Sequence, residues 1–418
     1  MHRYIRSIPV IIASLIILAS SPAQAAPVTV HCMGGHELAA AVIAAPPNTT
    51  LEVSGVCNGP INIVVDDLVL IGNNSGTHAV IQKPAFIPFP QDMVVIDGAV
   101  RVSISGFDIQ NGLVGVKGIS NASFSLDNVN AIDNIIGISL DSANAAFNDV
   151  TIKGTAPGAA ATGLNLENGS SINMTGTVDI NGITAFGINV QTNSSLTLKE
   201  AAALHSHHNL MGGQVSINAS FFAETGSEAH FHDNSAIGFS VNTGSTGMLF
   251  NASLFTRNNG LDGLDVVSSS NFEVDGDSRV VSENNGREGV SIDDSTFNMF
   301  GFFSSRPGLP NLTAIGNAEN GVQVEATSKL DVGRNASITA TDNGNAGILL
   351  DDGSSAVIQD SNINHNNAPL VNGNSGRKAD IVATFGSRLT FNDGNNIGFV
   401  SCDKRSYSRG DVKCNRRN

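Results

Sequence analysis

The sequence predicts an all-β fold, a right-handed parallel β-helix built from three-strand coils of about 25 residues, with a short N-terminal capping helix. Three observations predict it. A motif of the form glycine–apolar–any–apolar recurs through the chain; a second motif, serine–any–apolar–any–apolar or a close relative, follows it; and a third short apolar segment ends in asparagines. Such regular repetition indicates a solenoid, in which neighbouring coils bury each other's apolar face.

The glycine motif sets the period of the repeat. Clear copies occupy residues 137–140, 163–166, 187–190, 238–241, 263–266, 289–292, 321–324 and 347–350, and weaker copies begin at Gly115 and Gly213. Successive glycines recur at nearly constant intervals, except that the interval from Gly289 to Gly321 is clearly longer than the others. The longer coil contains Pro307 and Pro310, so we expect a protruding loop over residues 302–311.

The other two segments of each coil also alternate apolar and polar residues. The second occurs at 195–198, 270–274, 295–299, 328–332 and 387–391, and the third at 280–285, 338–343 and 363–367. Alternate side chains of a strand point to opposite faces, so the apolar set should fill a narrow core, with Phe239, Phe272, Phe297 and Phe391 inside it. Asparagines at the same turn of successive coils should hydrogen-bond along the stack and tolerate left-handed backbone geometry.

We expect four parts along the chain: a signal peptide at 1–25, an N-terminal cap at 26–57, the β-helix at 58–401, and a C-terminal cap with a basic tail at 402–418. The first part combines a positive start, an apolar segment and a small-residue cleavage site, which is the pattern of an export signal. A retained anchor is the alternative, although the apolar segment is short for a bilayer span. Cleavage would leave a secreted or periplasmic monomer without a membrane span.

Four cysteines follow the expected cleavage site, in two local pairs at opposite ends of the chain: Cys32 with Cys57, and Cys402 with Cys414. In an oxidising compartment they predict two terminal disulfides. Three pairings are possible, and the two local bridges require only short loops to close. Free buried thiols are the alternative, and zinc is disfavoured because neither pair has close ligand spacing with histidines beside it. Residues 37–45 predict a short amphipathic helix that covers the first coil.

The charge of the body limits its partners. The whole chain carries a formal charge of -15, but between residues 26 and 401 only 14 basic side chains face 35 acidic ones, which gives -21. A body of this charge repels nucleic acid and other polyanions unless a cation bridges them, so no nucleic-acid partner is expected.

The stretch from Cys32 to Gly72 combines a cysteine, a helix, the segment Leu-Glu-Val-Ser-Gly-Val-Cys at 51–57, and the apolar segments at 61–63 and 68–72. It is similar to the opening of pectin-lyase-like right-handed β-helix proteins, and the repeats extend the resemblance over nearly the whole mature chain. The resemblance implies the fold and an association with a polysaccharide or cell-surface glycan. It does not specify an activity, because such proteins include lyases, hydrolases, epimerases and surface proteins.

Acidic residues gather in or beside the glycine motif of nearby coils: Asp262, Asp265, Glu288, Asp293, Asp294, Asp351 and Asp352. A polysaccharide lyase needs a base beside a uronate carboxylate and a cation that neutralises it. The candidate catalytic residues are therefore Asp265, Asp293 and Asp294, with Arg279 and Arg287 as carboxylate binders. The turn at Asp351 and Asp352 is the candidate metal site; Ca²⁺ is the ion it would take, and no cofactor is required. Carboxylates that keep the surface solvated, and ordinary surface salt bridges, are the alternative.

Histidines form a second candidate site. His205 and His207 share one alternating face, as do His230 and His232, and the two pairs are separated in the sequence by one coil, so they should stack directly. Such a patch is a candidate for ligand binding, by holding a transition metal or by serving as base and acid. A ladder of stacked imidazoles without a ligand is the alternative.

An outward row of small polar side chains is the third candidate surface. It comprises Ser139, Asn165, Asn189, Ser240, Asp265, Ser291 and Gln323. The chain has no Trp and two Tyr, which disfavours sugar binding on aromatic platforms. The polar row would hold an extended glycan by hydrogen bonds, or hold nothing.

Two hypotheses of function follow. The first, which we prefer, is a non-catalytic exported protein of the envelope or the extracellular space, structural or interacting, associated with polysaccharide. The alternative is a calcium-assisted polysaccharide lyase or epimerase acting on an acidic glycan, with its site between Gly238 and Gly321. Carboxylates and an arginine lining one groove beside the 302–311 loop would favour the enzyme. Hydrolysis is disfavoured because the Asn-Thr-Asp, Gly-His-Gly and Arg-Ile-Lys motifs of polygalacturonase-like enzymes are missing.

Overall fold

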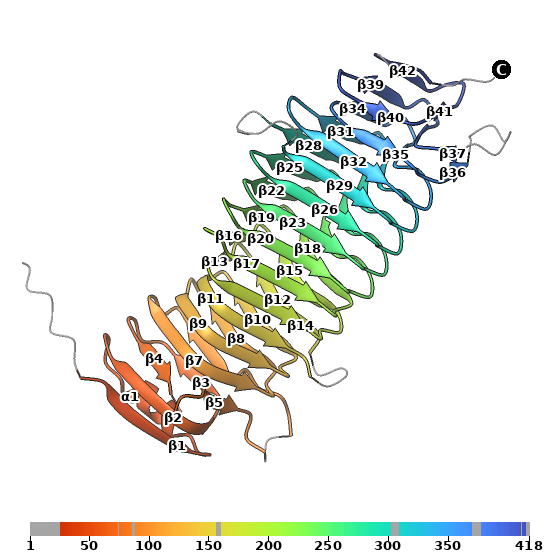
Figure 1. The fold of residues 1–418 in the computed structure, drawn as a ribbon. Helices are drawn as coiled ribbons and strands as arrows, with labels where there is room; N and C mark the ends of the chain where they lie inside the picture. Colours follow the sequence, from red (N-terminus) through yellow and green to blue (C-terminus); the bar gives the residue numbers. More distant parts are fainter. Residues whose placement is uncertain are drawn as a thin grey trace, which may run out of the picture.

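The computed structural model describes residues 26–73, 75–85, 88–155, 160–301, 309–369, 378–410 and 412–414. They form a parallel β-helix of about 13 turns, drawn out as a rod from the N-terminal end (red) to the C-terminal end (blue) (Figure 1). The predicted fold class is thereby confirmed. The predicted signal peptide at 1–25 lies outside the described residues.

Every coil of the rod's middle contributes three strands, as the sequence predicts. The glycine motif forms a 14-stranded parallel sheet, which we call the first face. Its strands are β3 (Ile61–Ile63), β6 (Val94–Asp97), β8 (Val114–Ile119), β10 (Ile136–Asp141), β12 (Thr162–Glu167), β15 (Phe186–Gln191), β18 (Met211–Ser216), β21 (Phe239–Val241), β24 (Leu264–Val267), β27 (Val290–Asp293), β30 (Val322–Glu325), β33 (Ile348–Leu350), β38 (Ile381–Ala383) and β41 (Val400–Cys402).

The serine motif forms the second face of the rod. Its strands are β4 (Val69–Gly72), β13 (Ser171–Met174), β16 (Ser195–Leu198), β19 (Ser220–Ala223), β22 (Thr246–Phe250), β25 (Asn271–Asp275), β28 (Thr296–Phe300), β31 (Lys329–Val332), β34 (Ser355–Ile358), β39 (Arg388–Phe391) and β42 (Tyr407–Arg409). Four long strands, β2 (Thr50–Asn58), β7 (Val102–Gln110), β9 (Ser123–Ile132) and β11 (Asn144–Lys153), continue from this face into the next, so the two faces count as one 26-stranded sheet.

The segments that end in asparagine form the third face. Its strands are β5 (Ala79–Gln82), β14 (Thr177–Asn181), β17 (Ala203–His207), β20 (Glu228–His232), β23 (Ser253–Arg257), β26 (Arg279–Glu283), β29 (Asn311–Ile315), β32 (Ser337–Thr341), β35 (Asn362–Asn364) and β40 (Asn396–Ile397). Beside the rod, β36 (Ala368–Pro369) and β37 (Lys378–Ala379) make a small antiparallel pair.

The glycines of the motif stand directly above one another. A Cβ atom on Gly163 would lie 2.4 Å from the carbonyl oxygen of Gly187, and one on Gly238 would lie 2.6 Å from that of Gly263, so a side chain has no room there. The column passes through Gly212, whereas Gly213 is in register with Ile188. The sequence expectation that counted Gly213 is therefore wrong by one residue, because both neighbouring glycines fit the motif.

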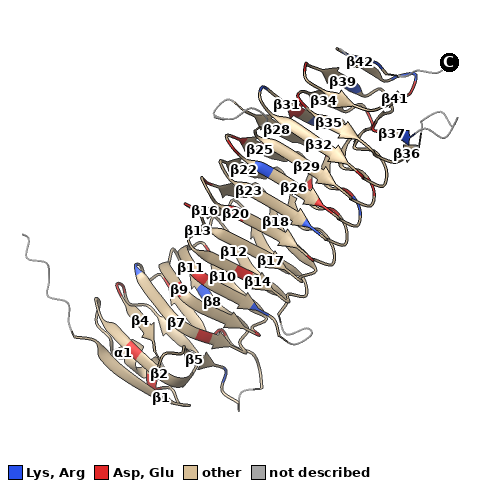
Figure 2. Ribbon diagram, in the orientation of Figure 1, with Lys and Arg blue, Asp and Glu red and all other residues tan. Residues whose placement is uncertain are grey.

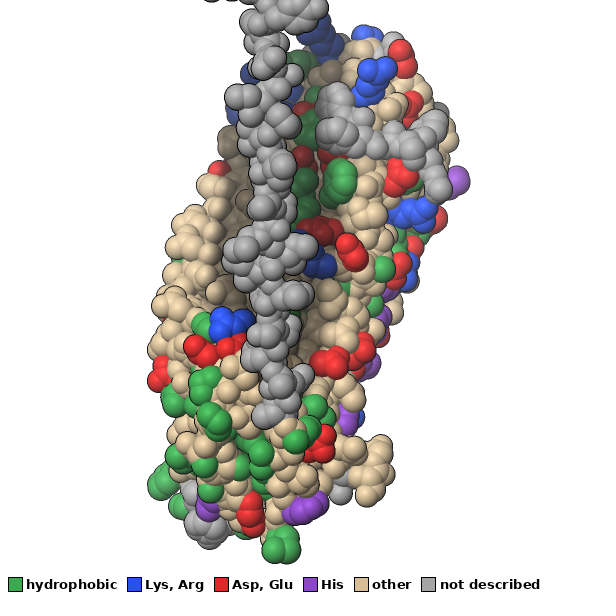
Figure 3. Space-filling view, turned by 90° about the vertical axis from the view of Figure 1, so that its left-hand side faces the viewer, with side chains coloured by type: hydrophobic (Ala, Val, Ile, Leu, Met, Phe, Trp, Pro, Cys, Tyr) green, Lys and Arg blue, Asp and Glu red, His purple; other side chains and the backbone are tan. Residues whose placement is uncertain are grey.

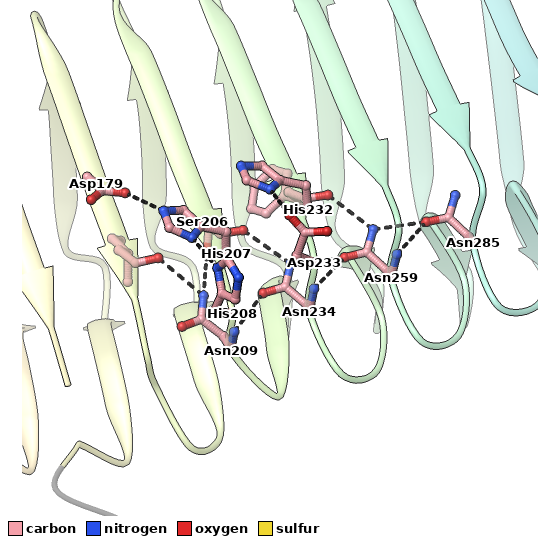
Figure 4. A network of polar contacts seen from close by, with 12 residues as sticks. Asp179, Ser206, His207, His208, Asn209, His232, Asp233, Asn234, Asn259 and Asn285 are labelled. Atoms are coloured by element: carbon pink, nitrogen blue, oxygen red, sulfur yellow. Dashed lines mark hydrogen bonds and ion pairs between the residues drawn. The ribbon is translucent and has the colours of Figure 1, made fainter. Parts of the chain in front are cut away.

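A ladder of buried asparagines runs along the corner between the third and first faces, as predicted. Its members are Asn209, Asn234, Asn259, Asn285, Asn317, Asn343 and Asn366. Each of the first six donates its backbone N–H to the side-chain oxygen of the next, over 3.0 to 3.2 Å. Figure 4 shows the part of the ladder from Asn209 to Asn285. The last, Asn366, donates to Asp380 over 2.9 Å. The residue before a ladder asparagine has positive φ, for example 54° at both His208 and Asp233.

The core is apolar and closed at both ends. The inward phenylalanines are buried as predicted, and the rings of Phe231 and Phe239 stack with their centroids 4.5 Å apart. At the N-terminal end, β1 (Val28–Met33) pairs with β2, and the helix α1 (Glu37–Ala44) buries Leu38 and Val42 against the first coil. No helix in the described part of the chain has the length and apolar character to cross a membrane.

Both predicted disulfides are confirmed. Cys32 is bonded to Cys57 across β1 and β2, with the Cα atoms 4.9 Å apart. Cys402 is bonded to Cys414 at the C-terminal end, with the Cα atoms 5.5 Å apart. Disulfides of this kind are typical of proteins that fold outside the reducing cytoplasm.

The loop predicted at 302–311 falls in the sequence between β28 on the second face and β29 on the third face. Residues 302–308 of that loop lie outside the described residues. Aspartates and glutamates are spread along the rod, whereas lysines and arginines are fewer (Figure 2).

Candidate functional site

The predicted polar row exists and is longer than the sequence analysis proposed. Strand register places in one outward row on the first face Ser139, Asn165, Asn189, Gln214, Ser240, Asp265, Ser291 and Gln323. Gln214 was missed because its motif was aligned on Gly213. The side chains are joined within the row: Asn189 donates to Asn165 over 2.8 Å, and Gln214 donates to Asn189 over 3.0 Å. We call this row the polar strip.

Beside the polar strip, two buried carboxyl groups form a cluster with a partly exposed arginine. Asp262 and Glu288 occupy the position before the motif glycine in neighbouring coils and are only 3% and 2% exposed. The Nη2 atom of Arg287 lies 3.3 Å from Oδ2 of Asp262, and its Nε lies 3.0 Å from Oε2 of Glu288. The backbone N–H of Glu288 donates to Oδ1 of Asp262 over 3.2 Å. We call these three residues the proton-sharing cluster.

The two carboxyl groups are buried side by side, so the protonation of one depends on the protonation of the other. Burial raises the pKa of Asp262 to about 8, and its hydrogen bond to Glu288 adds to the rise. Burial also acts to raise the pKa of Glu288, but the hydrogen bonds that its carboxylate receives from Asp262 and Arg287 outweigh it, and that pKa lies below its ordinary value. At neutral pH Asp262 therefore holds the proton and Glu288 is ionised.

Two more carboxyl groups adjoin the cluster. Burial raises the pKa of Asp265 to about 6, although a hydrogen bond from Ser240, over 3.3 Å, partly opposes the rise. Glu319 has a raised pKa because its carboxyl hydrogen-bonds to Glu288 and is partly buried. Sequence reasoning missed Glu319, yet it stands one coil above Arg287, two residues before a motif glycine, so the repeat alignment could have found it.

The remaining predicted catalytic residues do not join this cluster. Asp293 lines a separate pocket, and the Asp294 carboxylate accepts a hydrogen bond from Ser269 over 3.1 Å. Arg279 lies on an exposed position of the third face, away from the first-face carboxylates, so its grouping with Asp265 is wrong. The position of a residue within its coil decides which face it lies on. Arg279 is the first residue of a third-face strand, so it lies on the third face. The strands that flank the predicted 302–311 loop, β28 and β29, belong to the second and third faces, whereas the cluster lies at the start of first-face strands.

A pocket of about 330 Å³ lies where first-face strands end, lined by Asp293, Glu325, Ala326, Asp351, Asp352 and Phe385. The structure thus brings Asp293 close to the two predicted metal ligands. Asp351 also accepts hydrogen bonds from the Thr384 hydroxyl and the Asp352 N–H, over 2.6 and 2.9 Å. Within the described ranges, no three His, Cys, Asp or Glu side chains are arranged to hold a metal ion. Seen from the side, the rod is hollowed along its length, with acidic side chains in the hollow (Figure 3).

The predicted histidine patch lies on the third face. His205 stacks on His230 with centroids 4.7 Å apart, and His207 stacks on His232 at 4.9 Å. Beyond His230 the stack continues onto Phe255, over which Arg257 lies at 4.7 Å from the ring centroid. The stacking predicted from the one-coil separation is therefore confirmed. Burial and the neighbouring imidazoles lower the pKa of His205.

The strand register defines the protein as a parallel β-helix. No protein-family model matches the chain, and no curated protein matches it. Among solved structures, it is similar to the A-module of the mannuronan C-5 epimerase AlgE6 from Azotobacter vinelandii, at 10% identity and a TM-score of 0.46, over 91% of this chain and 94% of that one. It is also similar to an alginate lyase from Paenibacillus sp. str. FPU-7, at 11% identity and a TM-score of 0.17, over 91% of this chain and 97% of that one. The fold rests on the strand pairing described above and on neither likeness.

Proposed function

We propose that this protein is an exported β-helix, secreted or periplasmic, that binds an extended polysaccharide along the polar strip without acting on it chemically. The observation that carries the proposal is the register of the strip, which places one hydrogen-bonding side chain per coil at a spacing of about 4.8 Å; all of them except the buried Ser240 are partly exposed. Amides and hydroxyls in a row pair with sugar hydroxyls along a chain. The charge of -21 on residues 26–401 opposes a polyanion and favours a neutral glycan.

Binding measurements on variants of the strip test this proposal. The double replacement Asn189→Leu and Gln214→Leu removes two neighbouring amides, and Thr339→Leu on the third face is the matched control. Affinity for neutral glucans and mannans, and for alginate and pectate with and without Ca²⁺, is measured by retention and calorimetry. We expect the double variant to bind its glycan about tenfold or more weakly, at roughly 1 kcal/mol per lost hydrogen bond, and the control to bind normally. Equal loss in the control, or no retention of any glycan, contradicts the proposal.

A second candidate function, a polysaccharide lyase or epimerase, is favoured by the proton-sharing cluster. At neutral pH Asp265, with its pKa of about 6, is mainly ionised and suited to act as a base, while Asp262, with its pKa of about 8, is mainly protonated and suited to act as an acid. Carboxyl groups whose pKa values are driven apart beside an arginine are typical of acid–base sites. The side chain of Arg287 is 44% exposed, so it is open to a uronate carboxylate.

In the lyase reaction, Asp265 would take the proton beside the uronate carboxylate, and the resulting negative charge would be neutralised by Arg287 or by Ca²⁺. The electron pair then forms a carbon–carbon double bond, the glycosidic carbon–oxygen bond breaks, and Asp262 protonates the departing oxygen. An epimerase would instead return a proton to the same carbon from the opposite side. Ca²⁺ held by the carboxylates of the 330 Å³ pocket belongs to this proposal.

Incubation with alginate or pectate, with and without Ca²⁺, distinguishes the two candidates. Unsaturated uronate products, seen by ultraviolet absorbance, or altered uronate stereochemistry, seen by NMR, would overturn the non-catalytic proposal. In that case Asp265→Asn and Asp262→Asn should each lower the rate about 100-fold or more, whereas Asp342→Asn, at an exposed turn, should not. Retention of a glycan without turnover would support the first proposal.

A further inference from the structure

The end of the third-face strand β17 carries two imidazoles whose nitrogens converge. His207 is the last residue of β17, and His208 follows it in the turn with φ of 54°. Their Nδ1 atoms are 2.7 Å apart, and the rings stand nearly perpendicular, at 77° (Figure 4). The carboxylate of Asp179 contacts the opposite nitrogen of the His207 ring, Nε2. The two Nδ1 atoms therefore face each other without the carboxylate between them.

That carboxylate fixes which nitrogen of His207 is free. The Nε2 atom of His207 lies 3.0 Å from Oδ1 of Asp179, and the other oxygen of Asp179 accepts a hydrogen bond from Asn181 over 2.9 Å. An ionised carboxylate can only accept, so Nε2 of His207 carries the hydrogen and Nδ1 presents its lone pair. A carboxylate behind the distal nitrogen is the arrangement that orients histidine ligands in metal sites.

The separation of the two nitrogens suits one metal ion. Two ligand nitrogens at about 2.0 to 2.1 Å from a common ion stand about 2.9 Å apart when they are adjacent in octahedral coordination and about 3.3 Å apart in tetrahedral coordination. The observed 2.7 Å is a hydrogen-bond distance, and binding an ion requires the rings to open by about 0.2 to 0.6 Å. Imidazole nitrogen suits Zn²⁺, Ni²⁺ and Cu²⁺, whereas Ca²⁺ prefers oxygen.

We propose that His207 and His208 bind one divalent transition-metal ion through their Nδ1 atoms, with Asp179 as the residue that orients His207. Since no three such side chains surround a common point in the part of the chain that the structure describes, water completes the coordination. This site differs from the stacked pairs that the sequence predicts. Those rings face each other across coils, and His230 and His232 have their own carboxylate partners, Glu228 at 3.1 Å and Asp233 at 2.7 Å.

The repeat offers a variant that removes the ligand without disturbing the backbone. The left-handed position of His208 is occupied by Asn258 and Asn284 in later coils, with φ of 53° and 55°, so His208→Asn fits the turn. His365 occupies the same left-handed position farther along, with φ of 58°, and is exposed. His365→Asn is therefore the matched control.

Calorimetric titration of the mature chain with ZnCl₂ and with NiCl₂ at neutral pH tests the proposal. We expect one ion per chain, a Kd raised about tenfold or more by His208→Asn, and a Kd raised about 10- to 100-fold by Asp179→Asn. His365→Asn should bind as the parent does, and circular dichroism without metal should be the same for all four proteins. The proposal is overturned if His208→Asn binds as tightly as the parent, or if His230→Gln abolishes binding while His208→Asn does not.

Discussion

Replacing Asp262 by asparagine should change how the stability of the protein depends on pH. The carboxyl group of Asp262 is 3% exposed and keeps its proton in the folded protein up to about pH 8, whereas in the unfolded chain it ionises near 3.8. Asparagine has the same shape as the protonated carboxyl group. It can donate to Glu288 and accept the Glu288 N–H, so the variant keeps the hydrogen bonds of the cluster.

The magnitude follows from proton linkage. Between pH 3.8 and about 8 the folded protein holds a proton on Asp262 that the unfolded chain has lost, so the free energy of unfolding falls as the pH rises. The contribution of this group is complete below the lower value and is lost at the upper one. The slope is at most about 1.4 kcal/mol per pH unit for one proton, or about 2.7 kcal/mol from pH 5 to pH 7. The asparagine variant lacks this slope, and the lowered pKa of Glu288 acts alike in both proteins.

Urea denaturation of the parent and of Asp262→Asn at pH 5, 6 and 7 measures the effect. We expect the variant to gain up to about 2.7 kcal/mol on the parent across this range. Asp342→Asn removes an exposed carboxyl group and should show no such trend. A difference between parent and Asp262→Asn that does not change with pH would refute the reasoning, because it would mean that Asp262 is already ionised at pH 5.

Three further predictions concern the scaffold. Asn285→Ala should destabilise the protein by roughly 3 kcal/mol in denaturant titrations, because it leaves buried ladder groups without partners, whereas Asn298→Ala on the second face should cost less than about 1 kcal/mol. Gly238→Ala should cost about 1 to 3 kcal/mol in the same assay, since its Cβ would lie 2.6 Å from a carbonyl oxygen; an unchanged midpoint would contradict the glycine column. Replacing Cys32 and Cys57 by serine should cost about 3.5 kcal/mol in the chain-entropy model for a sequence separation of 25, and equal stability of parent and variant under oxidising conditions would rule this out.

The fold could be predicted from the sequence because each coil repeats the same constraints. Each motif glycine, alternating strand and turn asparagine occupies a fixed position within its coil. Because the coils stack in register, residues at the same position lie above one another along the rod. The one slip, Gly213 for Gly212, arose where two adjacent glycines satisfied the motif equally. The disulfide at the N-terminal end could also be predicted, because Cys32 and Cys57 are close enough in the sequence to pair over a short loop.

The candidate site could be predicted only in part. The sequence placed Asp262, Asp265 and Glu288 on neighbouring coils. Their positions in the repeat do not show how deeply each side chain is buried. Whether a carboxyl group at the start of a strand faces water or lies under its neighbours depends on side-chain packing, and that decides whether it ionises. Arg279 was grouped with these residues by closeness in sequence, although it belongs to another face. Glu319 was overlooked because the sequence analysis did not compare the position two residues before each motif glycine, where Arg287 and Glu319 both lie.

The backbone N–H hydrogen bonds of the asparagine ladder all run in one direction along the rod, and the ladder ends at Asp380. Every rung gives its backbone hydrogen toward the C-terminal coils, whereas Asp380 accepts one from Asn366 on its N-terminal side and one from Phe399 on its C-terminal side, both over 2.9 Å. A carboxylate has no side-chain hydrogen to pass on, so the amide relay stops there. A coil duplicated ahead of Asn366 would copy one asparagine of the ladder and so continue it, whereas a coil added beyond Asp380 would follow a carboxylate and not an amide. The ladder therefore favours lengthening of the rod by duplication of coils in its middle.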